Sequence, residues 1–450
     1  MVPTITDALR RVKDDLSQLL RPEAILELCR QCGHEWRQRV LDPVTTIHVF
    51  VLQILHGNTA CAHLPHLANQ RFNASAYCQA RARLPLELLE KLLQRVCEAM
   101  QPATQASARW HGHRTYFLDG SGFSTPDTAA LQNEFGQPGN QKEGCGFPVG
   151  RLLALFHAGS GLLLKVLTAP LRSHDLTQVA STQAELQEGD LLLGDRGFCS
   201  YAHLALLSVR KIQAVFRMHH RQIVDFTPGR AHVVPGKDRL RKGVPRSRWL
   251  RRLGVTDQWV EWFKPEDCPP WMTAVAYASL PASLTLRELR YRVGQPGFRT
   301  RDITLVTTLL DPELYSSQEL AELYRMRWRI ETNLRHLKTT MHMDVLRCET
   351  VAGVRKELTV FALVYNLVRL VMLAAAERQK VDAERISFVD ALRWLAHAPP
   401  GAELPSLVVN PYRPNRLEPR AIKRRYKEYD FLTRPRKELR KQLLGEEVAP

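Results

Sequence analysis

The sequence predicts an α/β protein in which a layered core of strands and helices lies between two helical regions. Two observations support this class. Apolar residues recur at helical spacing from residue 1 to about 105, and from residue 114 the period shortens to β-rich runs that alternate with helical segments. The length of 450 residues also allows two or three domains, each with a sizeable core.

The charge balance points to a polyanionic partner. Lys and Arg total 63 against 46 Asp and Glu, which gives a formal net charge of +17. An excess of this size is typical of proteins that bind nucleic acid. The segment 358–376 approaches the length of a membrane span, but Asn366 and Arg369 interrupt it. We therefore expect a buried core helix there and no membrane partner.

The nine cysteines have no regular spacing, which argues against a disulfide framework and indicates a reducing compartment. Cys29, Cys32 and His34 resemble half of a zinc site, but no second pair completes it, so a structural role is expected. The first sixteen residues contain no apolar stretch of the kind found in a signal peptide. We expect a cytoplasmic protein.

Residues 106–218 are expected to form the first part of the core. "RTYFLD" (114–119) is a short strand that ends at a turn signal, and residues 150–170 have the pattern of two strands around a glycine turn. A helical segment follows, then the apolar strand 190–195, a second helix and the strand 213–218. The predicted order is three strands, then helix, strand, helix and strand.

Residues 219–302 are punctuated by Pro and Gly and carry four of the eight tryptophans, which predicts a β-rich insertion. Within it, the stretch 237–252 has eight Lys or Arg and a single Asp, a density that suits phosphate binding. Arg248 and Arg251 are the candidate DNA-binding residues in this stretch. An exposed flexible loop is the alternative interpretation.

The core is expected to resume at residues 303–380, with one strand, a long helix that begins at Ser316, and the apolar helix described above. Residues 381–450 are basic and rich in Pro, which predicts a helical, basic C-terminal region that could contribute to dimerisation.

One helical segment, "YRMRWRIETNLRHLK" (324–338), sets a single carboxylate among cations. On a regular helix, Tyr324, Arg327, Glu331 and Lys338 fall within a stripe roughly 60° wide. An adjoining apolar stripe predicts that these side chains border the buried face. The alternative is a set of surface salt bridges, each worth about 0.2–0.5 kcal/mol.

The order of strands and helices resembles that of a ribonuclease H-like core. In that fold the first and fourth strands lie side by side at the centre of the sheet. Asp119 ends the first predicted strand and Asp195 ends the fourth, so the resemblance implies that the two carboxylates are neighbours. The expected fold is α/β: a ribonuclease H-like catalytic core interrupted by a mostly β insertion, with an N-terminal helical domain and a helical, basic C-terminal region.

The motifs resemble those of the DDE transposases of bacterial insertion sequences, in the insertion-sequence-four family. That family's signature is Tyr, two residues, Arg, three residues, Glu, six residues, Lys, and residues 324–338 match it without a gap. "LDGSGF" and "GDRGF" are similar to the motifs that carry the family's first and second Asp. The similarity extends across most of residues 114–441.

The resemblance implies that Asp119, Asp195 and Glu331 are catalytic and hold two Mg²⁺ or Mn²⁺ ions. Three converging carboxylates without a cation would repel by about 1 kcal/mol per pair in water at 4 Å. Oxygen ligands without thiol or imidazole suit these hard ions. Two ions about 3.5–4 Å apart can activate the attacking oxygen and stabilise the leaving oxygen of a displacement at phosphorus.

The same resemblance implies that Tyr324, Arg327 and Lys338 position DNA phosphates near the cut. Arg offers a planar fork and Lys a point charge to phosphate oxygens. Arg335 and Arg196 are further candidates, although each could be a simple ion-pair partner.

Members of that family free the 3′ hydroxyl at each end of an element, in some cases through a DNA hairpin, and join those ends to target DNA. The resemblance therefore implies a transposase that acts on terminal inverted repeats and target DNA as a homodimer. A hairpin would need an aromatic side chain to receive a flipped base. Trp271, Tyr291 and Phe298 are candidates, although core packing is the commoner role of such residues.

The N-terminal helical region, residues 1–105, is implied to recognise the terminal repeats. Arg71, Arg81 and Arg83 could face DNA there or could be ordinary surface arginines. Two other functions remain open: a ribonuclease H-like nuclease or resolvase without strand transfer, and a catalytically silent DNA-binding protein derived from a transposase.

Overall fold

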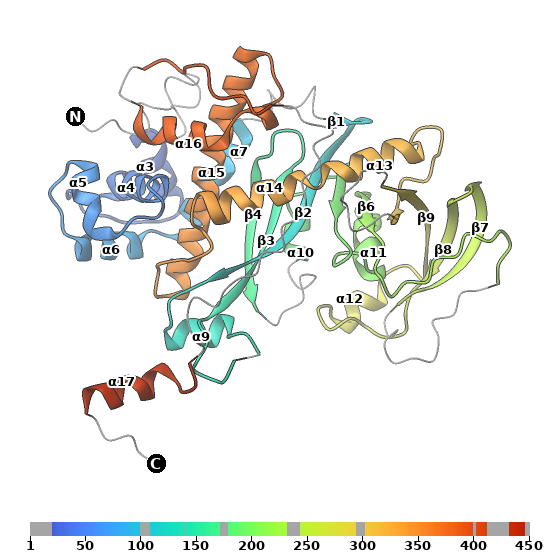
Figure 1. The fold of residues 1–450 in the computed structure, drawn as a ribbon, viewed down its shortest axis with the longest axis horizontal. Coiled ribbons are helices and arrows are strands. Elements are labelled where there is room, and N and C mark those ends of the chain that lie inside the picture. Colours follow the sequence, from blue (N-terminus) through green and yellow to red (C-terminus); the bar gives the residue numbers. More distant parts are fainter. Residues whose placement is uncertain are drawn as a thin grey trace.

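The computed structural model describes residues 20–99, 109–139, 141–171, 179–231, 244–293, 302–398, 402–411 and 432–445. A ten-stranded mixed sheet crosses the molecule, with most helices gathered at one end and a group of β-strands at the other (Figure 1). The mixed α/β class predicted from the sequence is confirmed.

The N-terminal helices pack beside the central helix α15 (Val351–Gln379). Side-chain caps begin two of them, because Asp42 accepts a hydrogen bond from the N–H of Thr45 and Asn73 accepts one from the N–H of Ala76. The elements are α3 (Pro22–Gln31), α4 (Pro43–Leu55), η1 (Cys61–His63), α5 (Leu64–Ala68), α6 (Ala74–Arg83) and α7 (Leu86–Ala99).

The centre of the sheet has the order β4-β3-β2-β5-β6. β2 pairs in parallel with β5, and β5 pairs in parallel with β6, whereas β3 and β4 are antiparallel to their neighbours. The predicted adjacency of the first and fourth core strands is therefore confirmed. The strands are β1 (Arg109–Trp110), β2 (His113–Ser124), β3 (Val149–His157), β4 (Leu163–Pro170), β5 (Leu191–Gly194) and β6 (Gln213–Arg217).

The sheet continues beyond β6 through four antiparallel strands in the order β10-β9-β8-β7. Three of them come from the segment in which short strands were predicted, and β10 comes from the segment after it. The elements are β7 (Arg246–Gly254), β8 (Asp257–Phe263), α12 (Ala274–Ala278), β9 (Ser283–Arg292) and β10 (Asp302–Thr307).

Side chains alternate between two cores, one on each face of the sheet. Phe117, Leu193 and Val215 face the larger core, which also contains α13, α14, α15 and the N-terminal helices. Leu118 and Leu192 face the smaller core, which is covered by α10 (Val179–Gln183), α11 (Tyr201–Val209) and the region of α12. The face occupied by each residue at a strand end follows from this alternation.

The helix α15 is long and apolar enough to cross a membrane, but 89% of its most apolar window is buried inside the protein. It contacts α4, α7, α16 (Phe388–His397) and β4. The prediction of a buried core helix at 358–376 is confirmed. The last described helix, α17 (Arg436–Leu444), lies beside α9 (Ala129–Phe135) (Figure 1).

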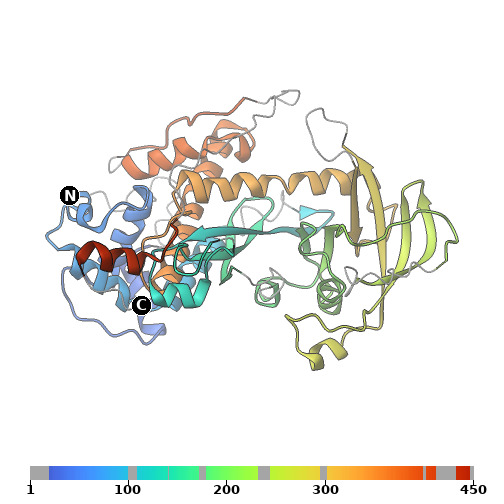
Figure 2. The same cartoon turned by 60° about the horizontal axis from the view of Figure 1, so that its bottom comes forward.

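The helix expected to run unbroken from Ser316 is divided into three segments that follow one line (Figure 2). They are α13 (Ser317–Met326), α14 (Arg329–Arg335) and the π-helical turn η4 (His336–Thr340). At the first junction the N–H of Arg327 bonds to the carbonyl of Tyr324, three residues back, which tightens the turn. Apolar spacing is too coarse a signal to reveal one tightened and one widened turn.

Candidate active site

Two aspartates follow the paired segments of neighbouring parallel strands. Leu118 of β2 pairs with Gly194 of β5, so Asp119 and Asp195 occupy the next position along each chain segment. Asp195 directly follows β5, as predicted, but the prediction that the first strand ends at Asp119 was wrong, because β2 continues to Ser124 through its pairing with β3. Both aspartates continue the alternation that sends Phe117 and Leu193 to the larger core. The two carboxylates therefore face the side of the sheet that α13 and α14 cover.

Backbone donors orient each aspartate. The N–H of Gly120 donates to Asp119 Oδ1 at 2.8 Å, and the N–H of Gly197 donates to Asp195 Oδ1 at 2.7 Å. A Cβ atom on Gly197 would lie 3.0 Å from that carboxylate oxygen. The glycine in "GDRGF" therefore allows the loop to close tightly around Asp195.

Arg327 links Asp119 to Glu331. Its Nη1 lies 3.2 Å from Asp119 Oδ2, and its Nη2 lies 3.6 Å from Glu331 Oε1. The guanidinium is buried, whereas the Glu331 side chain is 64% exposed. Within the described ranges, Arg327 Nε has no hydrogen-bond partner although it is buried. The predicted pairing of Arg327 with Glu331 is present, and Arg327 also reaches across to the sheet.

The electrostatics indicate that the three carboxylates share one neighbourhood. Burial raises the pKa of Asp119 to about 6, and the nearby charge of Arg327 and the N–H of Gly120 oppose that rise. Asp195 and Glu331 both raise the same pKa further. The buried Arg327 keeps a raised pKa because Tyr324 and these three carboxylates outweigh the effect of its burial.

The remaining signature residues lie at different depths. Tyr324 is 3% exposed, its ring lies 5.6 Å from the Arg327 guanidinium carbon, and burial raises its pKa well above the usual range. Its hydroxyl has no hydrogen-bond partner among the described residues. Lys338 is half-buried in η4, and Arg335 is exposed at the end of α14.

The other predicted DNA-binding arginines are exposed. Arg196 follows Asp195 directly and is exposed on the same loop. Arg248 and Arg251 lie on β7, the last strand at the far edge of the sheet. Arg248 pairs with Glu261 across the strands, and Arg251 lies over the ring of Trp259 at 5.5 Å. These two arginines are therefore part of the β7–β9 strands and not of the carboxylate site.

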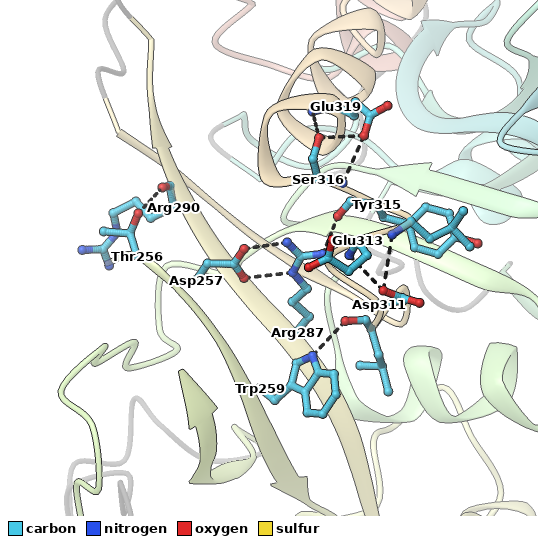
Figure 3. Close-up of polar contacts among 12 residues, drawn as sticks. Thr256, Asp257, Trp259, Arg287, Arg290, Asp311, Glu313, Tyr315, Ser316 and Glu319 are labelled. Carbon is cyan, nitrogen blue, oxygen red and sulfur yellow. Dashed lines mark hydrogen bonds and ion pairs between the residues drawn. The ribbon is translucent and has the colours of Figure 1, made fainter. Parts of the chain in front are cut away.

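The helix that carries Tyr324 is anchored to β8 and β9 by a buried ion pair (Figure 3). Arg287 donates from Nε and Nη2 to both oxygens of Asp257 at 2.9 and 2.5 Å, and from Nη1 to the carbonyl of Tyr315 at 2.6 Å. Ser316 and Glu319 then form a capping box that begins α13. This network fixes the start of the helix whose far end reaches the carboxylates.

A pocket at Tyr324 is lined in part by residues that the sequence analysis did not assign, among them Arg325 and Trp328. It has a volume of about 210 Å³, and Tyr291, Tyr324, Trp328 and Arg325 line it. Arg217, at the end of β6, is a further cation whose charge acts on both tyrosines. Trp328 directly follows the signature Arg, and no spacing rule marks Arg217 in the sequence.

Of the three aromatics considered for a flipped base, only Tyr291 lines this pocket. Trp271 packs against the smaller core, on the other face of the sheet. Phe298 and the stretch 237–243 lie outside the described residues, as do residues 412–431 of the basic C-terminal region.

The N-terminal arginines differ in their surroundings. Arg81 is partly buried, donates to Gln53 Oε1 at 3.1 Å and lies over the ring of Phe50 at 4.9 Å. It is therefore a packing residue of the N-terminal helices. Arg71 and Arg83 are exposed. Cys29, Cys32 and His34 do not form a metal cluster in the described part of the chain.

The donor set suits a divalent ion only in part. Across the described ranges, no three His, Cys, Asp or Glu side chains converge closely enough to hold an ion. Arg327 bridges two of the three carboxylates. The candidate ligand atoms are all carboxylate oxygens, which Mg²⁺ and Mn²⁺ prefer. The hydroxyl of Tyr324 and Nε of Arg327 are buried nearby without a hydrogen-bond partner among the described residues. Asp119 and Asp195 therefore fit such an ion, with Glu331 beside them.

A family model described as the transposase DDE domain matches residues 110–367, which is more than half of the chain and includes all three carboxylates. The chain belongs to the DDE transposase family. It is thus a transposase, an enzyme that uses divalent metal ions to cleave DNA and transfer strands.

Curated relatives support the same assignment. The transposase is 26% identical to the transposase InsG for insertion sequence element IS4 of Escherichia coli K12, and the alignment covers 96% of each chain. It is 32% identical to the putative transposase InsZ of the same organism over 28% of this chain and 42% of InsZ. The resemblance to the insertion-sequence-four family is confirmed.

A solved structure is loosely similar in shape. The transposase resembles the piggyBac transposase in a synaptic complex with hairpin DNA, with a TM-score of 0.43 and 8% identity over 86% of this chain and 78% of that chain. A likeness this loose adds nothing to the strand order described above.

Proposed function

We propose that this transposase cuts at the ends of a transposable element and joins the freed 3′ hydroxyls to target DNA, with Asp119, Asp195 and Glu331 as its catalytic carboxylates. One observation supports this most strongly. Two aspartates lie directly after the paired segments of adjacent parallel strands, and Arg327 connects one of them to a glutamate from a helix on the same face. The order and direction of β4-β3-β2-β5-β6 favour a ribonuclease H-like core.

The carboxylates would hold two Mg²⁺ or Mn²⁺ ions, which would activate the attacking oxygen and stabilise the leaving one. Arg327 keeps the three carboxylates from repelling one another when they carry no metal, because its charge acts on all of them. Ions held by Asp119 would compete with Arg327 for that carboxylate. The released guanidinium would then be available to a DNA phosphate.

DNA would pass over the exposed cations around this site. Lys338, Arg335 and Arg196 border the carboxylates on the helix side and the loop side, and Tyr324 with Arg327 forms the wall between them. We assign Arg248 and Arg251 to a second stretch of DNA, because β7 lies at the opposite edge of the sheet from β4. If DNA forms a hairpin, the pocket lined by Tyr291 would receive a flipped base.

The N-terminal helices would bind the terminal repeats through a basic pocket of about 410 Å³. Trp36, Arg37, Arg39 and Arg83 line it, and the ring of His34 stacks on Trp36 with centroids 6.2 Å apart. Burial lowers the pKa of His34, and the charges of Arg83 and Lys356 lower it further, as expected in a positive field. Such a pocket suits DNA phosphates.

We assign residues 1–105 to end recognition, residues 106–218 and 303–380 to the catalytic core, and residues 219–302 to a β-rich insertion. Residues 381–450 would contribute to a dimer, because two ends must be cut and joined together. The transposase would act in the cytoplasm on chromosomal DNA.

The test is a strand-transfer assay with labelled element ends, a target plasmid and Mg²⁺. Wild-type protein is expected to yield ends joined to the plasmid, and Asp195→Asn is expected to yield neither cut nor joined products while it still binds the ends in a mobility-shift assay. Glu98→Gln is the matched control, because this exposed carboxylate on α7 lies in the N-terminal helices.

Each other outcome selects another function. Cut ends without joined products would indicate a nuclease, and binding without any cleavage by wild-type protein would indicate a silent DNA-binding protein. Full cleavage by Asp195→Asn would remove Asp195 from the site. Affinity for end DNA should fall steeply as salt rises, because released counterions drive phosphate binding, and a flat dependence would contradict the basic pocket and the arginines of β7.

A further inference from the structure

Two thiols of the N-terminal helices lie in contact. Cys61 begins η1 and Cys78 lies on α6, and their Sγ atoms are 3.7 Å apart. Formation of a disulfide would require them to approach to about 2.0 Å, which side-chain rotation over a short distance can provide. All nine cysteines are free thiols.

The two thiols differ in access. Cys78 is exposed, whereas Cys61 is half-buried under α6. Burial raises the pKa of Cys61 to about 11, and the charge of Arg81 opposes that rise. Arg81 lies three residues after Cys78 on the same helix and is held in place by its hydrogen bond to Gln53. An exposed thiol is thus paired with a protected thiol that has a fixed cation nearby.

A third sulfur in the same region is insulated from this pair. Cys348 is 5% exposed, its backbone N–H donates to Glu357 Oε2, and burial followed by the Glu357 charge raises the pKa of its thiol well above the usual range. Its thiolate is therefore strongly disfavoured. Cys61 remains as the sulfur that can react with Cys78.

We propose that Cys61 and Cys78 form a reversible thiol-oxidation site, in which a low-molecular-weight disulfide reacts first with Cys78 and Cys61 then closes a disulfide between η1 and α6. The thiolate of Cys78 attacks the small disulfide, forms a mixed disulfide and releases one thiol. Cys61 loses its proton, attacks the sulfur of Cys78 and releases the second thiol. The two cysteines lose two electrons and two protons, which the small disulfide takes up as two thiols.

Arg81 favours the second step. Its cation lowers the pKa of Cys61 against the effect of burial, and so it stabilises the thiolate that must form there. The new bond would tie together two segments whose ends already pack on each other. Because α6 ends at Arg83, the closed disulfide would also fix the helix that lines the basic pocket. The oxidation chemistry itself does not depend on the proposed DNA-binding role.

The full-length protein is exposed to oxidised glutathione under native conditions, and its thiols are mapped by mass spectrometry of peptides. Wild-type protein is expected to yield a peptide pair joined through Cys61 and Cys78, lighter by two hydrogens and restored by dithiothreitol. Hydrogen exchange of the backbone in α6 is expected to slow in the oxidised form, since the cross-link restricts local opening.

Two single variants separate the roles of the thiols. In Cys61→Ser, glutathione should remain attached to Cys78 because no second thiol displaces it. In Cys78→Ser, Cys61 should stay unmodified under the same conditions because it is shielded. Cys268→Ser is the matched control: this half-buried thiol donates to the carbonyl of Met272 at 3.4 Å and lies apart from the pair, so this variant should oxidise like wild type.

The proposal is overturned if wild-type protein shows no Cys61–Cys78 link, if glutathione stays on Cys78 although Cys61 is present, or if Cys61 in Cys78→Ser reacts as fast as Cys78 in Cys61→Ser. Unchanged thermal unfolding of each reduced variant would verify that the substitutions leave the fold intact. Strand-transfer activity is not used as the readout, so a failure of the proposed function would not affect the result.

Discussion

Two arginine–aspartate pairs in this transposase differ in how many guanidinium nitrogens have a hydrogen-bond partner. Arg287 directs three N–H groups to Asp257 and Tyr315, and it is 1% exposed. Arg327 makes a single contact of 3.2 Å with Asp119 and a longer one of 3.6 Å with Glu331, and its Nε has no partner among the described residues. Both guanidinium groups are buried.

This difference suggests that one arginine stabilises the fold and that the other takes part in the proposed reaction. A buried ion pair in which each guanidinium nitrogen has a partner holds two segments in one arrangement, and breaking it leaves an uncompensated charge. A buried arginine that has an unused N–H donor and a long contact can change partners at a smaller cost in free energy. Arg287 therefore fixes the start of α13, and under the proposed function Arg327 is the cation that metal ions would displace and DNA phosphates would recruit.

The largest effect is expected for Arg287→Met. Asp257 would be left buried without its partner, so we expect the free energy of unfolding to fall by about 3–5 kcal/mol. Urea denaturation followed by tryptophan fluorescence measures this change. The double variant with Asp257→Leu should regain most of the lost stability, because no buried charge then remains. A loss below about 1 kcal/mol for the single variant would contradict the supporting role.

Acidification is expected to lower the free energy of unfolding through His203, a residue of α11 near the loop that carries Asp195. His203 is fully buried behind the loop that carries Asp195, and burial lowers its pKa to about 4 from an ordinary value of 6.5. Below pH 6.5 the His203 side chain binds a proton in the unfolded chain but stays neutral in the folded protein. Stability should therefore fall as pH drops from 6.5 towards 4, by up to about 3 kcal/mol from this residue.

Chemical denaturation across that pH range provides the measurement. His203→Phe keeps an aromatic ring against Phe216 and should make the profile shallower. It should not make the profile flat, because burial also lowers the pKa values of His157 and His336 to about 4. An unchanged slope in the variant would mean that His203 is not a source of the acid sensitivity.

A conservative change at the other arginine should affect chemistry more than stability. Lysine retains the charge of Arg327 but not its fork, so Arg327→Lys should lower the strand-transfer rate roughly 100-fold, as loss of one preorganised donor does. The free energy of unfolding should change by less than about 1 kcal/mol. Arg287→Lys is the matched control and should show the reverse pattern. Equal destabilisation by both variants would remove the distinction between the two pairs.

The smallest effect concerns metal binding to the folded protein. Mg²⁺ should raise the free energy of unfolding by roughly 1.4 kcal/mol at about ten times its dissociation constant. Asp195→Asn should reduce this stabilisation, while Glu98→Gln should leave it unchanged. Thermal unfolding with and without Mg²⁺ measures both, and an identical response of Asp195→Asn and wild type would argue against Asp195 as a ligand.

Much of the architecture could be predicted because it depends on short-range patterns. Short β-rich and apolar runs marked the strands that became β2, β3, β4, β5 and β6, and helical spacing marked α15 and the helix from Ser316. The adjacency of the strands that carry or precede Asp119 and Asp195 followed from the order of elements together with the resemblance, whereas the continuation of β2 to Ser124 did not. The apolar stripe beside Tyr324 is buried as predicted, with Leu323 at 1% and Ile330 at 0% exposure.

Other features had no signal of this kind. The tightened turn at Arg327 depends on backbone hydrogen bonds to carbonyls three residues back, which apolar spacing does not encode. Arg81 had the same appearance in the sequence as Arg83, yet packing against Phe50 separates it from the surface. The basic pocket combines residues 34–39 with the end of α6, and only their meeting in space makes a site.

Local pattern thus predicted most of the strands and helices and the apolar faces of the helices, because these properties depend on neighbours a few positions away. The candidate site residues came from the spacing of residues 324–338 and from the resemblance to a family. Packing alone decided that Arg327 also reaches Asp119, that Arg287 anchors α13, and that Cys61 contacts Cys78. Each of these contacts joins separate secondary-structure elements or an altered turn, and its distance and burial are set by how whole elements pack against one another.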